Sequence, residues 1–222
     1  MPRDGRMVSP YKKLNNRCAD WLFSFFTGDA RFCGTTASLC GIEKAWAEGD
    51  AAAMERAVRL DLTLHAMMFL QNGIPMLYSG DEIAQTNDYS YKKDPNKADD
   101  SRYLHRGKMR WDLAQRRKTP STPEARVFSG LIALNELRRH NPAFSPSADV
   151  WTLDTGDDGV LSIGRYAQGQ KIIGIFNFTE WDKCVILPYD RGVFTEMLTG
   201  KTETLQALTV PAYGFYYMVQ VM

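Results

Sequence analysis

The 222-residue chain is poor in the residues that build metal sites and disulfide frameworks. It has three histidines and four cysteines, no two cysteines form a C-x-x-C pair, and none stands at metal-ligand spacing from a histidine. Scattered thiols in a chain of this length fit small buried residues in a reducing compartment better than they fit a disulfide framework. We therefore expect no metal site, no cofactor and a cytoplasmic location.

The sequence also lacks an excess of one charge and any long apolar run. Its 27 Lys and Arg residues nearly balance 26 Asp and Glu residues, for a net charge of +1 and a pI near 7.6. A basic run at 102–118 is interrupted by Asp112 and preceded by further aspartates, which argues against a nucleic-acid surface. No stretch approaches the roughly 18 apolar residues of a membrane span. The charged start has no apolar run behind it, so we expect no secretory signal. We therefore expect the protein to bind neither nucleic acid nor a membrane.

What the sequence contains is typical of a globular protein with a core. Hydrophobic residues make up 44% and aromatic residues 12% of the chain, with a mean hydropathy of -0.35. Residues 50–72 predict a helix with Asp50 as its N-cap and a wide apolar surface. Gly73 ends it, and the apolar run 74–78 predicts a short buried strand, as in parallel α/β proteins.

The next 43 residues, 79–121, show no periodicity. Several tyrosines and a tryptophan favour an ordered loop over a disordered one, because disordered segments are poor in aromatic residues. A second helix is predicted to begin at Thr122-Pro123-Glu124, which is an N-cap, a proline at the first helical position and an acid in the first turn. Asn141-Pro142 ends it.

From residue 146 onward the pattern changes to short β-rich runs separated by Gly, Pro and Asp. This spacing is typical of an antiparallel β-sandwich. We therefore divide the chain into an irregular segment at 1–49, a helix–strand–loop–helix part at 50–145 and a β domain at 146–222. One parallel strand cannot form a sheet. The neighbours of strand 74–78 lie in sequence outside this chain, in another chain, or nowhere.

Four segments carry a resemblance to a known family. GIPMLYSGDEIAQ at 73–85 resembles the eighth-strand segment of the α-amylase family of glycoside hydrolases, which are (β/α)8 barrels, and KMRWD at 108–112 resembles the stretch that follows. TGDARFCGTTASL at 27–39 and DPNKADDSRYLHR at 94–106 are similar to amylosucrases and their sucrose-cleaving relatives. The closing LTGKTETLQALTVPAYGFYYM is also similar to that group.

The resemblance implies a fold and an activity. The fold is an α+β fragment, comprising the last strand and helices of a (β/α)8 (TIM) barrel followed by a C-terminal antiparallel β-sandwich. The activity is that of a retaining glucosyl transferase or glycoside hydrolase acting on sucrose or α-glucans. The family's nucleophilic aspartate, acid/base glutamate and His-Asp motif would precede residue 1. We therefore expect no catalytic residue in this chain, and no turnover by the chain alone.

Two adjacent carboxylates, Asp81 and Glu82, invite a catalytic interpretation. Neighbouring residues at a strand end point to opposite sides. A retaining pair needs two carboxyl groups about 5 Å apart facing one sugar ring. We therefore predict that both side chains hydrogen-bond the loop backbone. His65, four residues after Asp61, predicts a local side-chain pair on the first helix.

Two arginines match substrate-binding residues of the amylosucrase group. The resemblance implies that Arg31, in GDARFCG, contributes to the acceptor side of the pocket. It also implies that Arg102, in DDSRY, pairs with an upstream aspartate under the glucosyl ring. A guanidinium suits this role because its planar fork binds carboxylate or sugar oxygens with two donors. The alternative is that both are solvated surface arginines, as most arginines are.

Two other functions stay open. The chain can be a free-standing, non-catalytic carbohydrate-binding or interaction module, or a structural remnant without a ligand. In each case the unpaired barrel elements are expected to expose apolar surface, through which the chain can self-associate.

Overall fold

The computed structural model describes residues 33–187, 192–205 and 207–221, so Arg31 lies outside the described residues. The α-helices are α1 (Thr36–Cys40), α2 (Ile42–Glu48), α3 (Ala51–Leu70), α4 (Trp111–Arg116) and α5 (Pro123–His140). The 3-10 helices are η2 (Asp81–Ile83), η3 (Tyr89–Lys93), η4 (Ser101–Leu104) and η5 (Pro142–Phe144). The strands are β1 (Asp149–Leu153), β2 (Val160–Ala167), β3 (Gln170–Asn177), β4 (Lys183–Ile186), β5 (Val193–Glu196), β6 (Thr202–Thr204), β7 (Ala207–Val210) and β8 (Phe215–Val221).

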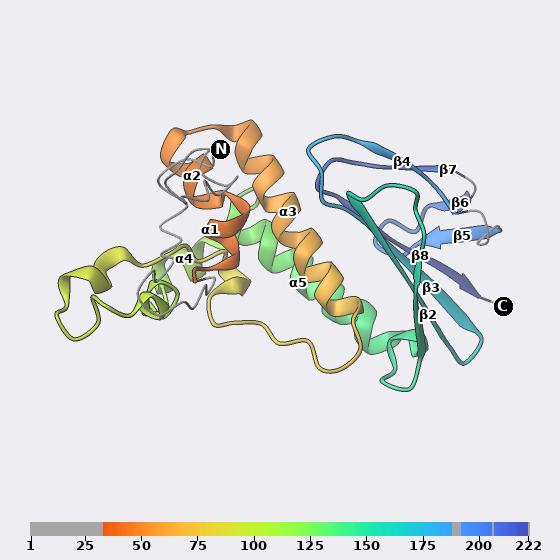
Figure 1. Ribbon diagram of the computed structural model, residues 1–222, viewed down its shortest axis with the longest axis horizontal. Coiled ribbons are helices and arrows are strands. Elements are labelled where there is room, and N and C mark those ends of the chain that lie inside the picture. The colour runs from red at the N-terminus through yellow and green to blue at the C-terminus, as the bar shows by residue number, and fades with distance from the viewer. Residues whose placement is uncertain (1–32, 188–191, 206, 222) are drawn as a thin grey trace, which may run out of the picture.

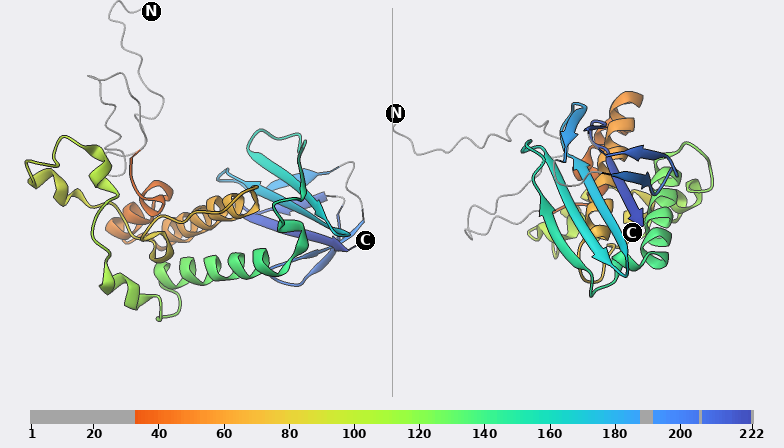
Figure 2. Two further views of the ribbon diagram at one scale, coloured as in Figure 1. Left: turned by 90° about the horizontal axis from the view of Figure 1, so that it is seen from below. Right: turned by 90° about the vertical axis from the view of Figure 1, so that its right-hand side faces the viewer.

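The two long helices form where the local signals place them. The Asp50 carboxylate accepts a hydrogen bond from the Ala53 N–H at 2.9 Å and caps α3. The Thr122 hydroxyl accepts from the Ala125 N–H at 3.2 Å and caps α5, which begins at Pro123 and ends at His140. Both predicted helices are therefore confirmed. They lie side by side along the middle of the molecule (Figures 1 and 2). No helix in the described ranges is long and apolar enough to cross a membrane.

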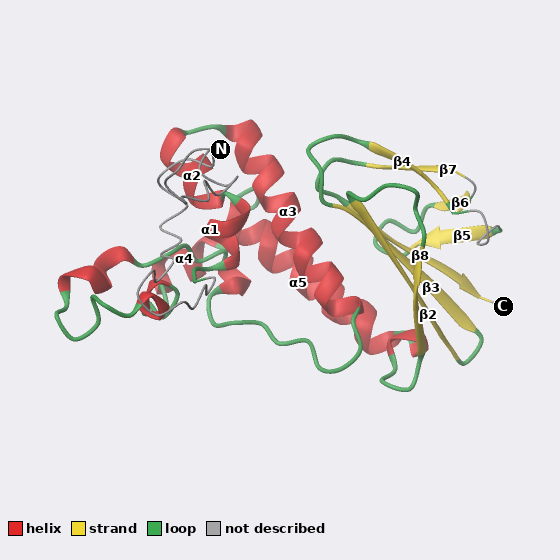
Figure 3. Cartoon of the chain, in the orientation of Figure 1, coloured by secondary structure: helices red, strands yellow, loops and turns green. Residues whose placement is uncertain are grey.

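The predicted strand at 74–78 is wrong. The segment between α3 and η2 has no strand hydrogen bonding and runs as an extended loop (Figure 3). Ile74 is 90% exposed and Met76 is 81% exposed. A strand needs a neighbour to satisfy its backbone N–H and C=O groups, and within the described residues no strand runs beside it. Segment 74–78 is apolar, as its sequence indicates, but burying it as a strand requires a neighbouring strand.

The C-terminal part is antiparallel throughout its described strands, as expected. Six strands form one sheet in the order β1-β2-β3-β8-β5-β6, and β4 pairs with β7 in a second sheet. β3 is buried on both faces. Ile173 and Ile175 belong to a cluster with residues of β4 and β7, whereas Ile172 and Phe176 belong to a cluster with α3 and α5. The two-residue alternation of a strand produces this division. The result is three layers: helices, the large sheet and the two-stranded sheet. Within the described residues the second sheet has only two strands, so this part of the chain does not form a sandwich of two large sheets.

Helix α3 docks closely on the large sheet. A Cβ on Gly174 of β3 would lie 2.3 Å from a methyl carbon of Leu70, so only glycine allows the helix end to approach this closely. The Tyr217 hydroxyl donates to the Ala66 carbonyl oxygen, and the Thr63 hydroxyl donates to the Tyr213 carbonyl oxygen at 2.7 Å. These contacts fix the helices against the sheet.

A buried arginine completes this junction. Arg165 of β2 is fully buried, and its guanidinium donates to three main-chain carbonyl oxygens. The acceptors are Ala143 at 2.7 Å, Leu70 at 2.7 Å and Ser145 at 2.9 Å. The cation therefore joins the C-terminal end of α3, the chain around η5 and the sheet, where it also complements the negative end of the α3 dipole.

Candidate functional site

The long segment predicted to be an ordered loop is organised by three aspartates at six-residue intervals. Asp88 accepts a hydrogen bond from the Ser90 N–H at 2.8 Å, Asp94 from the Asn96 N–H at 3.0 Å, and Asp100 from the Arg102 N–H at 3.0 Å. Asp88 caps η3 and Asp100 caps η4. Short acidic side chains favour such turns because they bond the backbone two residues ahead. Sequence reasoning found the loop but not this spacing.

The two ends of this segment, the 85–110 loop, are tied together. Gln85 is buried; its Nε2 donates to the Lys108 carbonyl oxygen at 3.3 Å, and its Oε1 accepts from the Arg110 N–H at 3.0 Å. The Asp88 N–H donates to the Leu104 carbonyl oxygen at 2.8 Å. A closed base of this kind gives the loop a defined shape despite its lack of long secondary structure.

The 85–110 loop encloses a cavity of about 510 Å³. Its wall contains an aromatic ring with two cations near it: Lys97 Nζ lies 5.5 Å and the Arg106 guanidinium carbon 6.0 Å from the centre of the Tyr103 ring. The lining residues are Gln85, Thr86, Asn87, Asp88, Ser90, Tyr91, Asp94, Lys97, Tyr103, Arg106, Gly107, Lys108 and Arg110. An aromatic face beside charged and amide groups suits a polar ligand with an apolar ring face.

The cavity carboxylates are poor candidates for proton transfer. The hydrogen bond from the Asn96 N–H is the largest cause that lowers the pKa of Asp94, and Lys97, whose Nζ lies 3.1 Å from Asp94 Oδ2, is the second. Asp94 is therefore ionised at neutral pH. Asp88 is engaged by the Ser90 N–H. A general acid needs a raised pKa and a free proton to deliver. The arrangement is suited to binding a ligand and offers no acid/base pair.

The segment 34–43 docks on the 85–110 loop through a polar network. The Thr35 N–H donates to Asn87 Oδ1 at 2.8 Å, and the Asn87 N–H donates to Ser38 Oγ at 2.9 Å. Glu43 Oε2 accepts from Ser38 Oγ at 2.6 Å and from the Tyr89 hydroxyl at 3.4 Å. Burial raises the pKa of Glu43, although these two hydroxyls oppose the shift. The network thus joins residues 34–39, GTTASL, to the loop that carries DPNKADDSRYLHR.

A buried acid–histidine–acid cluster lies under the start of the loop. His65 Nδ1 lies 2.9 Å from the Asp61 carbonyl oxygen and 3.1 Å from Asp61 Oδ1, and its Nε2 lies 3.8 Å from Asp81 Oδ2. The predicted local pair of Asp61 and His65 is confirmed, while the Asp81 contact was missed because it joins α3 to the loop. Burial alone would lower the pKa of His65, but Asp61 and Asp81 outweigh it and raise the pKa to about 10.

The predicted roles of Asp81 and Glu82 are confirmed. Asp81 Oδ2 accepts a hydrogen bond from the Tyr78 N–H at 3.0 Å, and Glu82 Oε2 accepts from the Gly80 N–H at 2.9 Å. Asp81 therefore both shapes the turn and contacts the His65 imidazole. Burial raises the pKa of Asp61, and His65 opposes the shift. The cluster serves to anchor the loop on α3.

Arg102 lies at the surface of the 85–110 loop. Its side chain is 49% exposed and forms a two-pronged ion pair with Asp100, with Nη2 2.8 Å from Asp100 Oδ2 and Nε 2.8 Å from Oδ1. This contact lowers the pKa of Asp100 to about 2. Arg102 is not among the residues that line the cavity. Its pairing with an aspartate under a glucosyl ring stays a prediction, as does the acceptor-side role of Arg31.

Other site residues escaped sequence reasoning. Asn87, Tyr89 and Glu43 come together only through the docking of 34–43 on the loop, and no local pattern marks them. Tyr103 stands next to Arg102 inside the segment that carried the resemblance, which is the one sequence signal that pointed to it.

Comparison with known proteins relates this arrangement to solved enzymes. No family model matches the sequence. An α-amylase from Anoxybacillus matches 75% of this chain at 20% identity with a TM-score of 0.50. AmyP in complex with maltose matches 73% at 15% identity with a TM-score of 0.59, and isomaltulose synthase from Klebsiella sp. LX3 matches 73% at 16% identity with a TM-score of 0.54. The neighbours are α-amylase-family glycoside hydrolases. At these identities the likeness is one of fold.

The match covers only part of each solved enzyme. The chain spans 33% of the Anoxybacillus α-amylase, 35% of AmyP and 38% of isomaltulose synthase. It therefore corresponds in fold to about a third of an α-amylase-family protein. Any activity of the whole enzymes is a matter of proposal for this chain.

Proposed function

We propose that this chain is a portion of an amylosucrase-like, retaining glucosyl transferase or glycoside hydrolase that acts on sucrose or α-glucans. The catalytic carboxylates belong to a part of the enzyme outside these 222 residues. This chain contributes the last barrel elements and a β-sandwich-type domain. The observation that carries the proposal is the ordered 85–110 loop, with its aromatic and charged cavity, within a fold shared with α-glucan enzymes.

The loop would hold a sugar in a defined way. A pyranose ring has an apolar C–H face that packs on an aromatic ring such as Tyr103, and hydroxyl groups at its edge. Asp94 accepts hydrogen bonds from hydroxyl groups, while Lys97 and Arg106 donate to them. Because Asp94 is fixed by its turn with the Asn96 N–H, this carboxylate needs little ordering on binding.

Binding of maltose or sucrose to the purified chain tests this role. In calorimetric titrations Tyr103→Ala should weaken binding by roughly tenfold, since removing a stacked ring costs on the order of 1 kcal/mol or more. Tyr166→Ala is the matched control, because Tyr166 is a partly exposed tyrosine on β2 remote from the loop. Equal affinity of the two variants would contradict the proposed role of the cavity.

A second candidate function is a free-standing, non-catalytic carbohydrate-binding or interaction module. The same cavity favours it, because binding requires no catalytic carboxylate. Reading the coding sequence upstream of Met1 distinguishes the two. An in-frame barrel with a nucleophile and an acid supports the enzyme, and an unrelated upstream sequence supports the module.

We further propose that the chain self-associates when it is isolated and that it functions in the cytoplasm. The support for self-association is the exposed apolar segment containing Ile74 and Met76. The support for the location is that Cys33, Cys40 and Cys184 are free thiols. Light scattering across a concentration series tests the first proposal, and Ile74→Ser with Met76→Ser should shift the chain toward monomer.

A further inference from the structure

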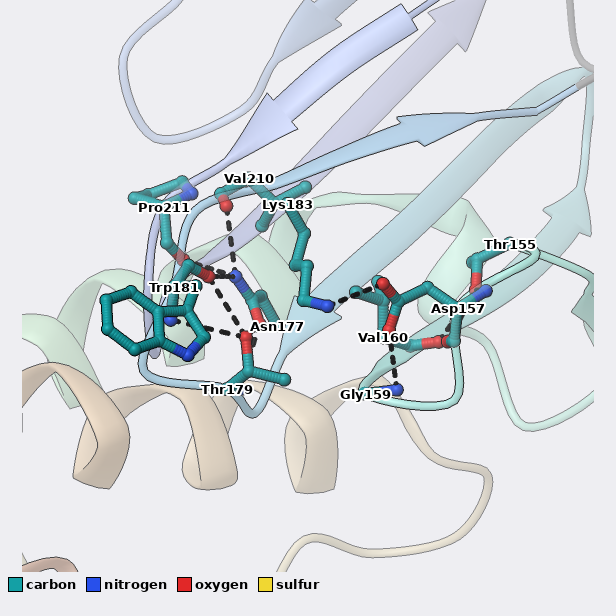
Figure 4. Close-up of polar contacts among 10 residues, drawn as sticks. All are labelled: Thr155, Asp157, Gly159, Val160, Asn177, Thr179, Trp181, Lys183, Val210 and Pro211. Atoms are coloured by element: carbon teal, nitrogen blue, oxygen red, sulfur yellow. Dashed lines mark hydrogen bonds and ion pairs between the residues drawn. The ribbon is translucent and has the colours of Figure 1, made fainter.

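A second feature suited to binding sugars lies in the β domain, at the turn between β3 and β4. Trp181 stands in this turn with 67% of its surface exposed. Tryptophan is the largest apolar side chain, and leaving it in water forgoes the stabilisation that burial provides. Figure 4 shows the turn around Trp181 and the polar contacts that surround it.

The turn is fixed by a buried asparagine. Asn177, the last residue of β3, has no exposed surface. Its Nδ2 donates to the carbonyl oxygens of Trp181 at 2.7 Å and of Val210 and Pro211 at 3.1 Å each. Its Oδ1 accepts from the Thr179 N–H at 2.9 Å. One side chain thus binds the Trp181 backbone to the strand before it and to the chain that follows β7 (Figure 4).

Further contacts from the chain that follows β7 hold the same turn. The Tyr213 N–H donates to the Thr179 carbonyl oxygen at 3.0 Å, and the Ala212 N–H donates to Asp182 Oδ1 at 2.8 Å. A Cβ on Gly159 would lie 2.3 Å from Thr179 Cγ2, so the neighbouring turn packs directly on this one. The exposed indole is therefore presented by a backbone with little freedom, which lowers the entropic cost of binding.

The surroundings of the indole define its ligand. Glu180 and Asp182 flank Trp181 in sequence and are exposed, while Lys183 is paired with Asp157 at 2.7 Å. Two carboxylates repel the phosphates of nucleic acid and interrupt the continuous apolar area that protein docking requires. A neutral ligand with an apolar ring face and hydroxyl groups at its edge fits both the ring and the acceptors.

We propose that Trp181 is a second α-glucan contact, a platform on which a pyranose ring stacks while Glu180 and Asp182 accept hydrogen bonds from its hydroxyl groups. The inference rests on the proposed α-glucan function but not on the cavity. The two features belong to different parts of the molecule, the 85–110 loop at one end and the sheet at the other (Figure 1). A long glucan held at Trp181 would raise the local concentration of chain ends at the rest of the enzyme.

Calorimetric titration of the full chain with maltoheptaose tests the platform. Trp181→Leu removes the ring but keeps an apolar side chain, and it should weaken one class of sites by roughly tenfold. Trp181→Phe should retain part of the affinity. Trp111→Leu is the matched control, since Trp111 is an indole of similar exposure, 71%, that lies at the start of α4 and not in the turn between β3 and β4. Urea unfolding should be unchanged in all three variants, because both indoles are exposed.

The outcomes separate the platform from the cavity. Maltoheptaose binding that is reduced by Trp181→Leu and persists in Tyr103→Ala supports the platform, whatever the fate of the cavity. If Tyr103→Ala abolishes binding and Trp181→Leu leaves it unchanged, the platform is overturned and the proposed function stands. Equal losses in Trp181→Leu and Trp111→Leu also overturn it, because any exposed indole would then suffice. No binding by the parent chain overturns both.

Discussion

Replacing Arg165 by methionine tests how the helices are joined to the sheet. Methionine fills similar space but donates nothing, so the carbonyl oxygens of Leu70, Ala143 and Ser145 lose their guanidinium donor. The Ser145 carbonyl oxygen keeps the Ala148 N–H at 3.0 Å, so two acceptors, Leu70 and Ala143, lose the donor that pairs them. Each buried acceptor left unpaired costs roughly 1–3 kcal/mol. We use the lower end of that range, because methionine also removes a buried charge whose desolvation opposes folding. The expected loss is about 2 kcal/mol in the free energy of unfolding.

Urea unfolding followed by far-UV circular dichroism measures this loss. With an m-value of about 3 kcal/mol/M the midpoint should fall by roughly 0.7 M. Arg165→Lys should recover only part of the loss, since a single ammonium group does not reproduce the fork that reaches three separate carbonyls. The control is Arg139→Met on α5, whose side chain is 64% exposed and paired with Glu136. It should change stability by less than about 0.5 kcal/mol. If Arg165→Met costs no more than this control, the buried guanidinium does not hold the junction together.

Three further predictions concern charge and activity. The free energy of unfolding should fall as the pH rises from 6.5 to about 10. In this range the folded chain keeps a proton on His65, whereas the unfolded chain releases it. The slope approaches about 1.4 kcal/mol per pH unit. The double variant Asp61→Asn, His65→Gln should flatten this slope when urea unfolding is measured at a series of pH values. An unchanged slope would refute the charged cluster. In a complete enzyme, Arg102→Ala should reduce sucrose turnover far more than thermal stability, with little rescue by Arg102→Lys; near-parental turnover would leave Arg102 a surface residue. The purified chain alone should not turn over sucrose, and a rate clearly above a blank would contradict this.

Residues near one another along the chain determined the helices, because their signals are local. Asp50 and Thr122 cap α3 and α5 through backbone N–H groups three residues ahead. The carboxylates of Asp81 and Glu82 likewise bond backbone groups within three residues, so their structural role followed from the sequence. The short β-rich runs after residue 146 also predicted the antiparallel strands, and the pairs β1–β2, β2–β3 and β5–β6 join runs that follow one another in the chain. The pairs β3–β8 and β4–β7 join runs that are not successive, and only the tertiary structure assigned them.

Contacts between residues distant in the sequence determined the features that local patterns did not predict. Segment 74–78 has the composition of a buried strand, yet it is exposed because a strand depends on a neighbour that no local pattern supplies. Gln85 bonds across the base of the cavity to Arg110, and the Asn87–Ser38 contact joins segments 49 residues apart. Arg165 reads as an ordinary polar residue in a β-rich run, but folding carries it into the core, where three carbonyl oxygens from other segments surround it. Burial and hydrogen-bond partners are properties of the packed chain, and the tertiary structure alone assigns them.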